Sequence, residues 1–315
     1  MSPKQFPHLE HDALEALDIT AEDIIAILEH LIRGSQSEQV WAAPKAVLTP
    51  PDGRYTMATL AMMDDPPLVA TKSLLLNARN SEIGLPQINS LVTLLHGQTG
   101  VPVMTMDGNW VTAVRTAGLS ALAAKHMANP DAATVAFIGT GTQARSHLTL
   151  FHQMFPLKHV KIFGRGQANI DRLGDLAAQM GLQSEVSDSP EAAMASADLV
   201  VTSVTHTSVE GPFLSADWLA PGSFAAVVDL AVPWHKETFG GLDRVVIDDL
   251  EQEMALPTKL ADPAHVHGDL TGLVTGAVTG RGAAQDRTAF VFRGHALGDL
   301  ALAALVYQTA RKQSG

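Results

Sequence analysis

The sequence predicts an α/β protein in which a doubly wound parallel sheet is inserted into a discontinuous, mixed α+β domain. Three observations support this prediction. Between residues 117 and 287, short apolar runs alternate with stretches of helical spacing, which is typical of parallel sheets. Between residues 1 and 116, the apolar runs are split by Pro and Gly, as in antiparallel sheets. Residues 288–315 add a strand and a helix, which are expected to complete the first domain.

The first domain is expected to begin with a helix and to continue as strands. Asp18 to Leu31 has helical spacing, with Thr20 as the expected N-cap. His96 to Gly100 and Asp107-Gly108-Asn109 are predicted to be hairpin turns. Five runs are predicted to form a largely antiparallel sheet: residues 46–48, 55–62, 68–76, 90–95 and 102–106.

The second domain opens with a complete β–α–β unit. An apolar run at 134–138 ends at Gly139-Thr140-Gly141-Thr142-Gln143-Ala144, and a helix at 146–155 and a strand at 160–163 follow. Glycines at 139 and 141 allow a sharp turn close to a pyrophosphate, and the helix dipole favours phosphate at that end. The alternative is an ordinary glycine turn, but the surrounding unit favours a Rossmann dinucleotide-binding domain.

The remaining elements continue the alternation of strand and helix. Parallel strands of this kind are joined by right-handed crossovers. In such sheets, ligands bind outside the carboxyl ends of the strands, near the point where the strand order reverses. Strands are predicted at 199–204, 223–230, 245–248 and 289–293, and helices at 168–180, 189–197 and 296–310.

Composition excludes several classes of function. The chain has 315 residues, of which 46% are hydrophobic, enough for two cores. Its net charge of -12 argues against a nucleic-acid or anionic-membrane partner. It has no cysteine, which excludes disulfides, thiolate catalysis and cysteine-bound metal. Because neither a signal-peptide core nor a long apolar run is present, we expect a cytoplasmic protein.

Two motifs carry a family resemblance. The run from Met106 to Ala117 (MDGNWVTAVRTA), followed by Gly139 to Arg145 (GTGTQAR), resembles the ornithine cyclodeaminase and μ-crystallin family. Further matches extend the resemblance over most of the chain: Lys72, Gly84-Leu85-Pro86, Asp229, Thr288-Ala289-Phe290 and Asp299. The resemblance implies an NAD(P)-dependent oxidoreductase that acts on the α-carbon of an amino or imino acid. It also implies a homodimer formed through the non-nucleotide domain.

Three charged residues are candidates for the chemistry. Lys72 lies between apolar runs, where burial would depress its pKa; the alternative is a lysine on the solvent face of a strand. Arg115 could bind a carboxylate with two hydrogen bonds, or could be a surface arginine. Asp229 follows a buried strand and could exchange a proton with an imine nitrogen, or could cap a helix. The resemblance favours the functional interpretation of all three, with Lys72 and Asp229 catalytic and Lys72 and Arg115 binding the substrate carboxylate.

Two departures from the family pattern bear on the substrate. Lys45 stands where many members carry an arginine, so a second carboxylate contact would lack the bidentate geometry. Between Arg54 and Pro66 the acids are Asp64 and Asp65, and no glutamate is present to hold the distal ammonium of ornithine. A cyclic imino acid therefore fits better, and the resemblance is closest in type to a Δ1-pyrroline-2-carboxylate reductase.

Cofactor choice depends on the segment after the second strand of the nucleotide domain. Gly164-Arg165-Gly166-Gln167 offers an arginine and no acid, which favours NADP(H), with NAD(H) as the alternative because Arg165 could simply stack on adenine. His206 is expected to line the nucleotide cleft. The residues expected to bind the cofactor are Thr116, Gly139, Thr140, Gly141, Thr142, Gln143, Ala144, Arg165, Thr205 and Asp229.

A metal site is not expected. His265, His267 and Asp269 have alternating spacing, but their segment contains Pro263 and Gly268 and is predicted to be a loop.

The preferred function is NAD(P)H-dependent reduction of Δ1-pyrroline-2-carboxylate or Δ1-piperideine-2-carboxylate to L-proline or L-pipecolate. One alternative is an ornithine cyclodeaminase or another amino-acid dehydrogenase that uses NAD. The second is a non-enzymatic NADP(H)-binding protein of μ-crystallin type.

Overall fold

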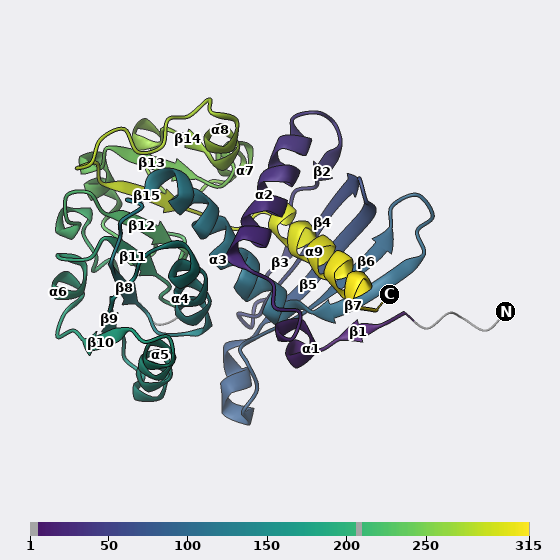
Figure 1. The fold of residues 1–315 in the computed structure, drawn as a ribbon, viewed down its shortest axis with the longest axis horizontal. Coiled ribbons are helices and arrows are strands. Elements are labelled where there is room, and N and C mark those ends of the chain that lie inside the picture. Colours follow the sequence, from purple (N-terminus) through teal and green to yellow (C-terminus); the bar gives the residue numbers. More distant parts are fainter. Residues whose placement is uncertain (1–5, 206–209, 315) are drawn as a thin grey trace. The chain divides into compact units, whose positions relative to one another are not determined.

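The computed structural model describes residues 6–205 and 210–314, which form two compact units (Figure 1). The first unit comprises the residues up to Arg115 and those from His295 onward, and the second comprises Thr116–Gly294. The boundary therefore falls within one helix, α3 (Gly108–Met127). No helix of the described ranges is long and apolar enough to cross a membrane.

A mixed, mainly antiparallel sheet forms the centre of the first unit. Its strand order is β1–β7–β6–β5–β4–β2, with β3 also paired to β4. Only the β1–β7 pairing is parallel among these described strands, as predicted for a largely antiparallel sheet. The strands are β1 (His8–Leu9), β2 (Val40–Ala42), β3 (Ala46–Leu48), β4 (Tyr55–Asp64), β5 (Pro67–Leu76), β6 (Ile88–His96) and β7 (Pro102–Asp107).

Helices pack on one face of this sheet. α9 (Ala296–Ser314) packs against α2 (Ala21–Ser35), β4 and β5, as Figure 1 shows. Thr20 caps α2 as predicted, because its side chain accepts from the backbone of Asp23, whose carboxylate accepts from the backbone of Thr20. The shorter helices of this unit are α1 (His11–Glu15) and the 3₁₀ helix η1 (Ala78–Ile83).

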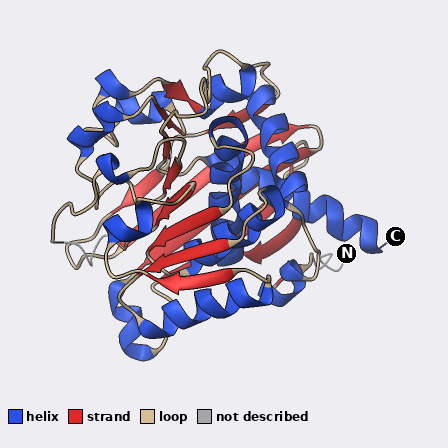
Figure 2. Cartoon of the chain, turned by 60° about the vertical axis from the view of Figure 1, so that its left-hand side comes forward, coloured by secondary structure: helices blue, strands red, loops and turns tan. Residues whose placement is uncertain are grey.

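The second unit contains a parallel sheet with the order β10–β9–β8–β11–β12–β15–β13–β14. All of its described pairings are parallel, which confirms the predicted doubly wound sheet (Figure 2). The order reverses between β8 and β11. The strands are β8 (Thr134–Ile138), β9 (His159–Phe163), β10 (Gln183–Val186), β11 (Leu199–Thr202), β12 (Phe224–Val227), β13 (Arg244–Ile247), β14 (Gly268–Asp269) and β15 (Thr288–Val291).

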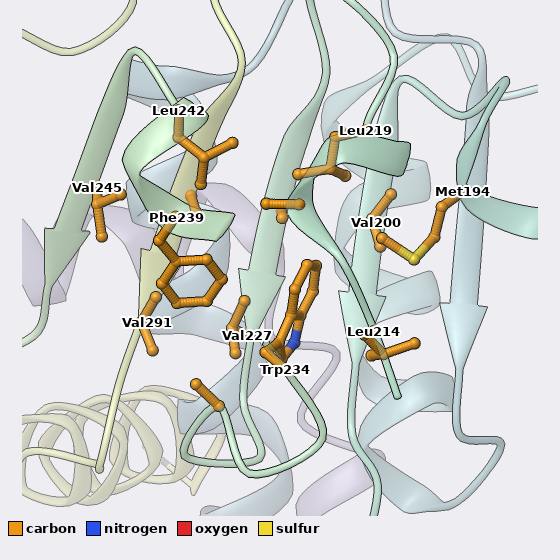
Figure 3. Close-up of a cluster of buried hydrophobic side chains, with 14 of the residues drawn as sticks. Met194, Val200, Leu214, Leu219, Val227, Trp234, Phe239, Leu242, Val245 and Val291 are labelled. Atoms are coloured by element: carbon orange, nitrogen blue, oxygen red, sulfur yellow. The ribbon is translucent and has the colours of Figure 1, made fainter. Parts of the chain in front are cut away.

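Helices and 3₁₀ turns connect these strands. Figure 3 shows part of the core that they enclose, where Trp234 and Phe239 pack with aliphatic side chains of the strands, such as Val200, Val227 and Val291. The connecting segments are α4 (Thr142–Met154), α5 (Gln167–Gln179), α6 (Pro190–Met194), η3 (Ala216–Trp218), η4 (Lys236–Gly241), α7 (Leu250–Ala255), η5 (Pro263–His265) and α8 (Leu270–Thr275).

Two predictions about the fold were wrong. Asp107-Gly108-Asn109 is not a hairpin turn but the start of α3, because the Asp107 carboxylate accepts from the backbone amides of Asn109 and Trp110. The strand assigned to the first domain, β15, pairs with β12 and β13 in the parallel sheet. Residues 288–294 therefore belong to the second unit, and the predicted domain boundary after residue 287 is corrected to follow Gly294.

Candidate active site

Two cations of the first unit meet at one buried carboxylate. Lys72 Nζ donates to Asp299 Oδ1 at 2.6 Å, and Arg115 Nε lies 3.0 Å from the same oxygen. The other oxygen, Oδ2, accepts a hydrogen bond of 2.8 Å from Thr59 Oγ1. The side chains of Lys72, Arg115 and Asp299 are 0%, 7% and 3% exposed. We call Thr59, Lys72, Arg115 and Asp299 the Asp299 cluster.

Sheet alternation explains why Lys72 is buried. On β5, residues 68, 70, 72 and 74 are buried, while 73 and 75 are exposed. The face that carries Lys72 is the one against which α9 packs, since Lys72 bonds to Asp299 of that helix. The alternative that Lys72 lies on a solvent face is therefore wrong.

The cluster carries excess positive charge. Burial, with contributions from Arg115 and Lys45, lowers the pKa of Lys72 to about 8, although Asp299 opposes this shift. Burial by itself would raise the pKa of Asp299, but Arg115, Lys72 and the two hydrogen bonds lower it overall. Half-buried Lys45 lies between β2 and β3 and adds a further positive charge near Lys72. An anionic ligand would balance this charge.

Arg115 retains donor capacity. Its Nη1 is buried and has no hydrogen-bond partner in the described part of the chain, and its Nε lies at ion-pair distance from Asp299 without hydrogen-bond geometry. A buried guanidinium with unused N–H groups can receive a planar carboxylate.

A pocket of about 590 Å³ lies at the glycine turn of the second unit. It is situated where the sheet order reverses, between the ends of β8 and β11, as expected for this fold. Its lining residues are Ile138, Gly139, Thr140, Gly141, Phe163, Gly164, Arg165, Asn169, Ser203, Val204, Thr205, Glu210, Gly211 and Phe213.

The turn leaves room for a phosphate group. Gly139 has a φ of +98°, and a Cβ there would lie 2.7 Å from the carbonyl oxygen of Ser203. A Cβ on Gly141 would meet no atom within 4 Å, so the space beside this glycine is open. Gly141 is also the N-cap of α4 and supplies no side-chain cap, which leaves the first amides of the helix available to an anion. These features fit a dinucleotide pyrophosphate.

The other predicted cofactor residues are placed as follows. Thr140, Arg165 and Thr205 line the pocket, and no acid follows β9 in the run 164–167. Thr142 and Gln143 form the first turn of α4, and Ala144 is fully buried in it. Thr116 is buried in α3 and does not line the pocket, and His206 lies outside the described residues.

Asp229 is buried just beyond β12. Its Oδ2 accepts a hydrogen bond of 3.1 Å from the amide of Val204, which lines the pocket, while Oδ1 has no hydrogen-bond partner among the residues described. Burial raises its pKa to about 6. The helical segment that follows, η4, has His235 as its N-cap, so Asp229 is not the cap of that segment. An aspartate in this state can exchange a proton near neutral pH.

The structure gives other roles to residues that the sequence left open or missed. His267 Nδ1 accepts from the amide of Val245, and Asp269 caps α8. No group of three or more potential metal ligands occurs within residues 6–205 and 210–314. His147 was not among the residues singled out from the sequence. It is buried and forms hydrogen bonds with Ser120 and with the carbonyl of Gln143, and burial lowers its pKa to about 4.

The role of Asp299 was also missed. The sequence singled out this residue only as a family match, although a lone acid among Leu297, Leu300 and Leu302 in an apolar stretch already suggests a buried and paired carboxylate.

Comparison with known proteins matches residues 9–314 to the model of the ornithine cyclodeaminase/mu-crystallin family. The ketimine reductase mu-crystallin of Mus musculus is 28% identical over 245 residues, covering 76% of each chain. Among solved structures, the Δ1-pyrroline-2-carboxylate reductase of Thermococcus litoralis, in complex with NADH and L-proline, has a TM-score of 0.88, 22% identity and 98% coverage of each chain. An archaeal alanine dehydrogenase dimer with bound NAD has a TM-score of 0.86, 24% identity and coverage of 98% and 97%.

Proposed function

The chain belongs to the ornithine cyclodeaminase/mu-crystallin family, and we propose that it is an NAD(P)H-dependent reductase of cyclic imino acids. The substrate would be Δ1-pyrroline-2-carboxylate or Δ1-piperideine-2-carboxylate, and the product L-proline or L-pipecolate. The observation that carries the proposal is the buried pair of cations, Lys72 and Arg115, of which Arg115 has unused donors for a carboxylate, in a chain that also has a pocket at its glycine turn.

Each charged group has a role in this reaction. Arg115 and Lys72 bind the carboxylate, with Lys45 adding positive charge. Asp229 in its protonated form gives a proton to the imine nitrogen, and the iminium that results accepts hydride more readily than a neutral imine does. A reduced dinucleotide held at the turn of Gly139 and Gly141 would supply the hydride for the carbon that bears the carboxylate. The proton and the hydride give the cyclic amino acid as a neutral secondary amine, which takes a further proton from solvent, as does the carboxylate of Asp229.

NADP(H) is the proposed cofactor. Arg165 lines the pocket after β9, where an acid would be needed to bind the ribose diol of NAD. An arginine at this position can instead bind the additional phosphate of NADP. NAD(H) is the alternative, and comparing KM for the two reduced cofactors decides between them.

A homodimer is proposed as the assembly. On the sheet face of the first unit opposite to Lys72, Leu60, Leu75 and Leu91 are 46%, 39% and 42% exposed. Such an apolar face is best covered by a second copy. Light scattering should give a dimeric mass that Leu75→Glu reduces to a monomer; a monomeric wild-type protein would contradict this assembly.

An amino-acid dehydrogenase or ornithine cyclodeaminase is the second candidate, because the fold is also that of an alanine dehydrogenase. A spectrophotometric assay with cyclic imines, amino acids and both cofactors distinguishes the candidates. Consumption of reduced nicotinamide with a cyclic imino acid supports the reductase. Rapid ammonia release from ornithine without added cofactor would reject it, and dinucleotide binding without any turnover would favour a μ-crystallin-type binding protein.

A further inference from the structure

Building on the proposed function, we propose that Asp299 is a positioning residue, which holds Lys72 and Arg115 together as a preformed binding site for the substrate carboxylate. Neither the motifs nor the comparisons assign it this role. Its helix, α9, lies at the far end of the chain from the strand that carries Lys72.

Both oxygens of Asp299 are engaged. Oδ1 is shared by Lys72 and Arg115, at 2.6 and 3.0 Å, and Oδ2 is held by Thr59 at 2.8 Å. Because β4, β5, α3 and α9 each contribute one side chain, the orientation of the carboxylate is fixed from several directions. Lys72 and Arg115 share one oxygen of Asp299 and are thereby kept adjacent, although their like charges repel each other. A substrate carboxylate can then use the remaining donors of both cations.

The charge of Asp299 also maintains the protonation of Lys72. The charged groups acting on Lys72 are Arg115, Lys45 and Asp299, and the first two favour the neutral amine. Asp299 opposes them by ion pairing and by its hydrogen bond. Without this carboxylate, Lys72 would lose its proton at a lower pH, and the site would lose one of its cations.

Asp299→Asn tests this role, because it keeps the shape of the side chain and removes the charge. In the reductive assay, kcat/KM should fall first at about pH 6 as Asp229 loses its proton, and should fall a second time at higher pH as Lys72 loses its proton. In the variant this second fall should begin about one pH unit or more below its wild-type position. The affinity for pyrrole-2-carboxylate, an unreactive planar carboxylate, should show the same displacement by calorimetry. Unchanged pH profiles would overturn the proposal.

Thr59→Val provides a second test if Asp299→Asn does not fold. The variant keeps every charge but removes the hydrogen bond to Oδ2 of Asp299. The alkaline fall of kcat/KM should therefore stay at the wild-type pH, while KM for the imino acid rises about threefold or more. A wild-type KM would contradict a positioning role. Glu22→Gln, an exposed carboxylate on α2, is the matched control and should alter neither quantity.

The proposed function and the positioning role of Asp299 can fail independently of each other. If the wild-type protein reduces no cyclic imine, the proposed function fails. Pyrrole-2-carboxylate binding by the wild type and by Asp299→Asn still tests the role of Asp299, because calorimetry does not require turnover.

Discussion

Replacing Asp229 by Asn should stabilise the protein more at pH 8 than at pH 5 while removing most of its activity. Burial raises the pKa of this carboxyl from 3.8 to about 6. The folded state therefore binds the proton more tightly than the unfolded state, and stability falls as pH rises from about 4 to 6. Each pH unit between the two pKa values corresponds to about 1.4 kcal/mol, so the ionised carboxylate destabilises the fold by about 3 kcal/mol above pH 6.

About half of this effect is already present at pH 5. The amide of Asn does not titrate, and any cost of burying it is the same at both pH values. The difference in unfolding free energy between the variant and the wild type should therefore be larger at pH 8 than at pH 5, by about 1 kcal/mol. Its oxygen can still accept from the amide of Val204, which preserves the local structure.

Urea denaturation at the two pH values measures the stability, and cyclic imine reduction measures activity. We expect kcat/KM to fall by about 10²- to 10⁴-fold, the usual contribution of a proton donor. Asp175→Asn, at an exposed position on α5, is the control and should change neither quantity. If the stability difference for Asp229→Asn is the same at both pH values, the carboxylate is not ionised in a buried state and the argument is refuted.

Three further predictions concern the second unit, the cofactor and helix α2. Gly139→Ala should destabilise the fold by about 1–3 kcal/mol, because of its positive φ and the nearby Ser203 carbonyl, whereas Gly141→Ala should leave the melting temperature unchanged but weaken NADPH binding in calorimetry. Arg165→Asp should raise KM for NADPH about tenfold or more without raising that for NADH; equal changes for both cofactors would remove the basis for NADP(H). Thr20→Ala should lower the unfolding free energy by about 1 kcal/mol in urea titrations, and no change would mean that the capping box is dispensable.

Periodicity predicted the elements well because each depends on neighbouring residues. The predicted strand at 46–48 has the observed bounds, and α2 begins after the predicted cap. The glycine turn ends β8 and begins α4, as its sequence required. Asp107-Gly108-Asn109 was mistaken for a turn because such residues favour both turns and helix starts, and the carboxylate of Asp107 selected the helix.

Sheet membership could not be obtained from the sequence in the same way. An apolar strand such as β15 has no local signal that identifies its partners. It lies between β12 and β13 because its buried side chains complete that sheet. The short β10 and β14 were likewise missed, since four exposed residues and a Gly–Asp pair carry no strand periodicity.

The sequence by itself determined most of the elements, the glycine turn and the identity of the charged candidates, because these follow from local periodicity and from motif spacing. The tertiary structure decided which of those charges meet. Asp299 lies 227 positions from Lys72 in the chain, yet it accepts its hydrogen bond. Packing of α9 on β5 brings the two together, and the cost of burying an unpaired charge makes the pairing necessary.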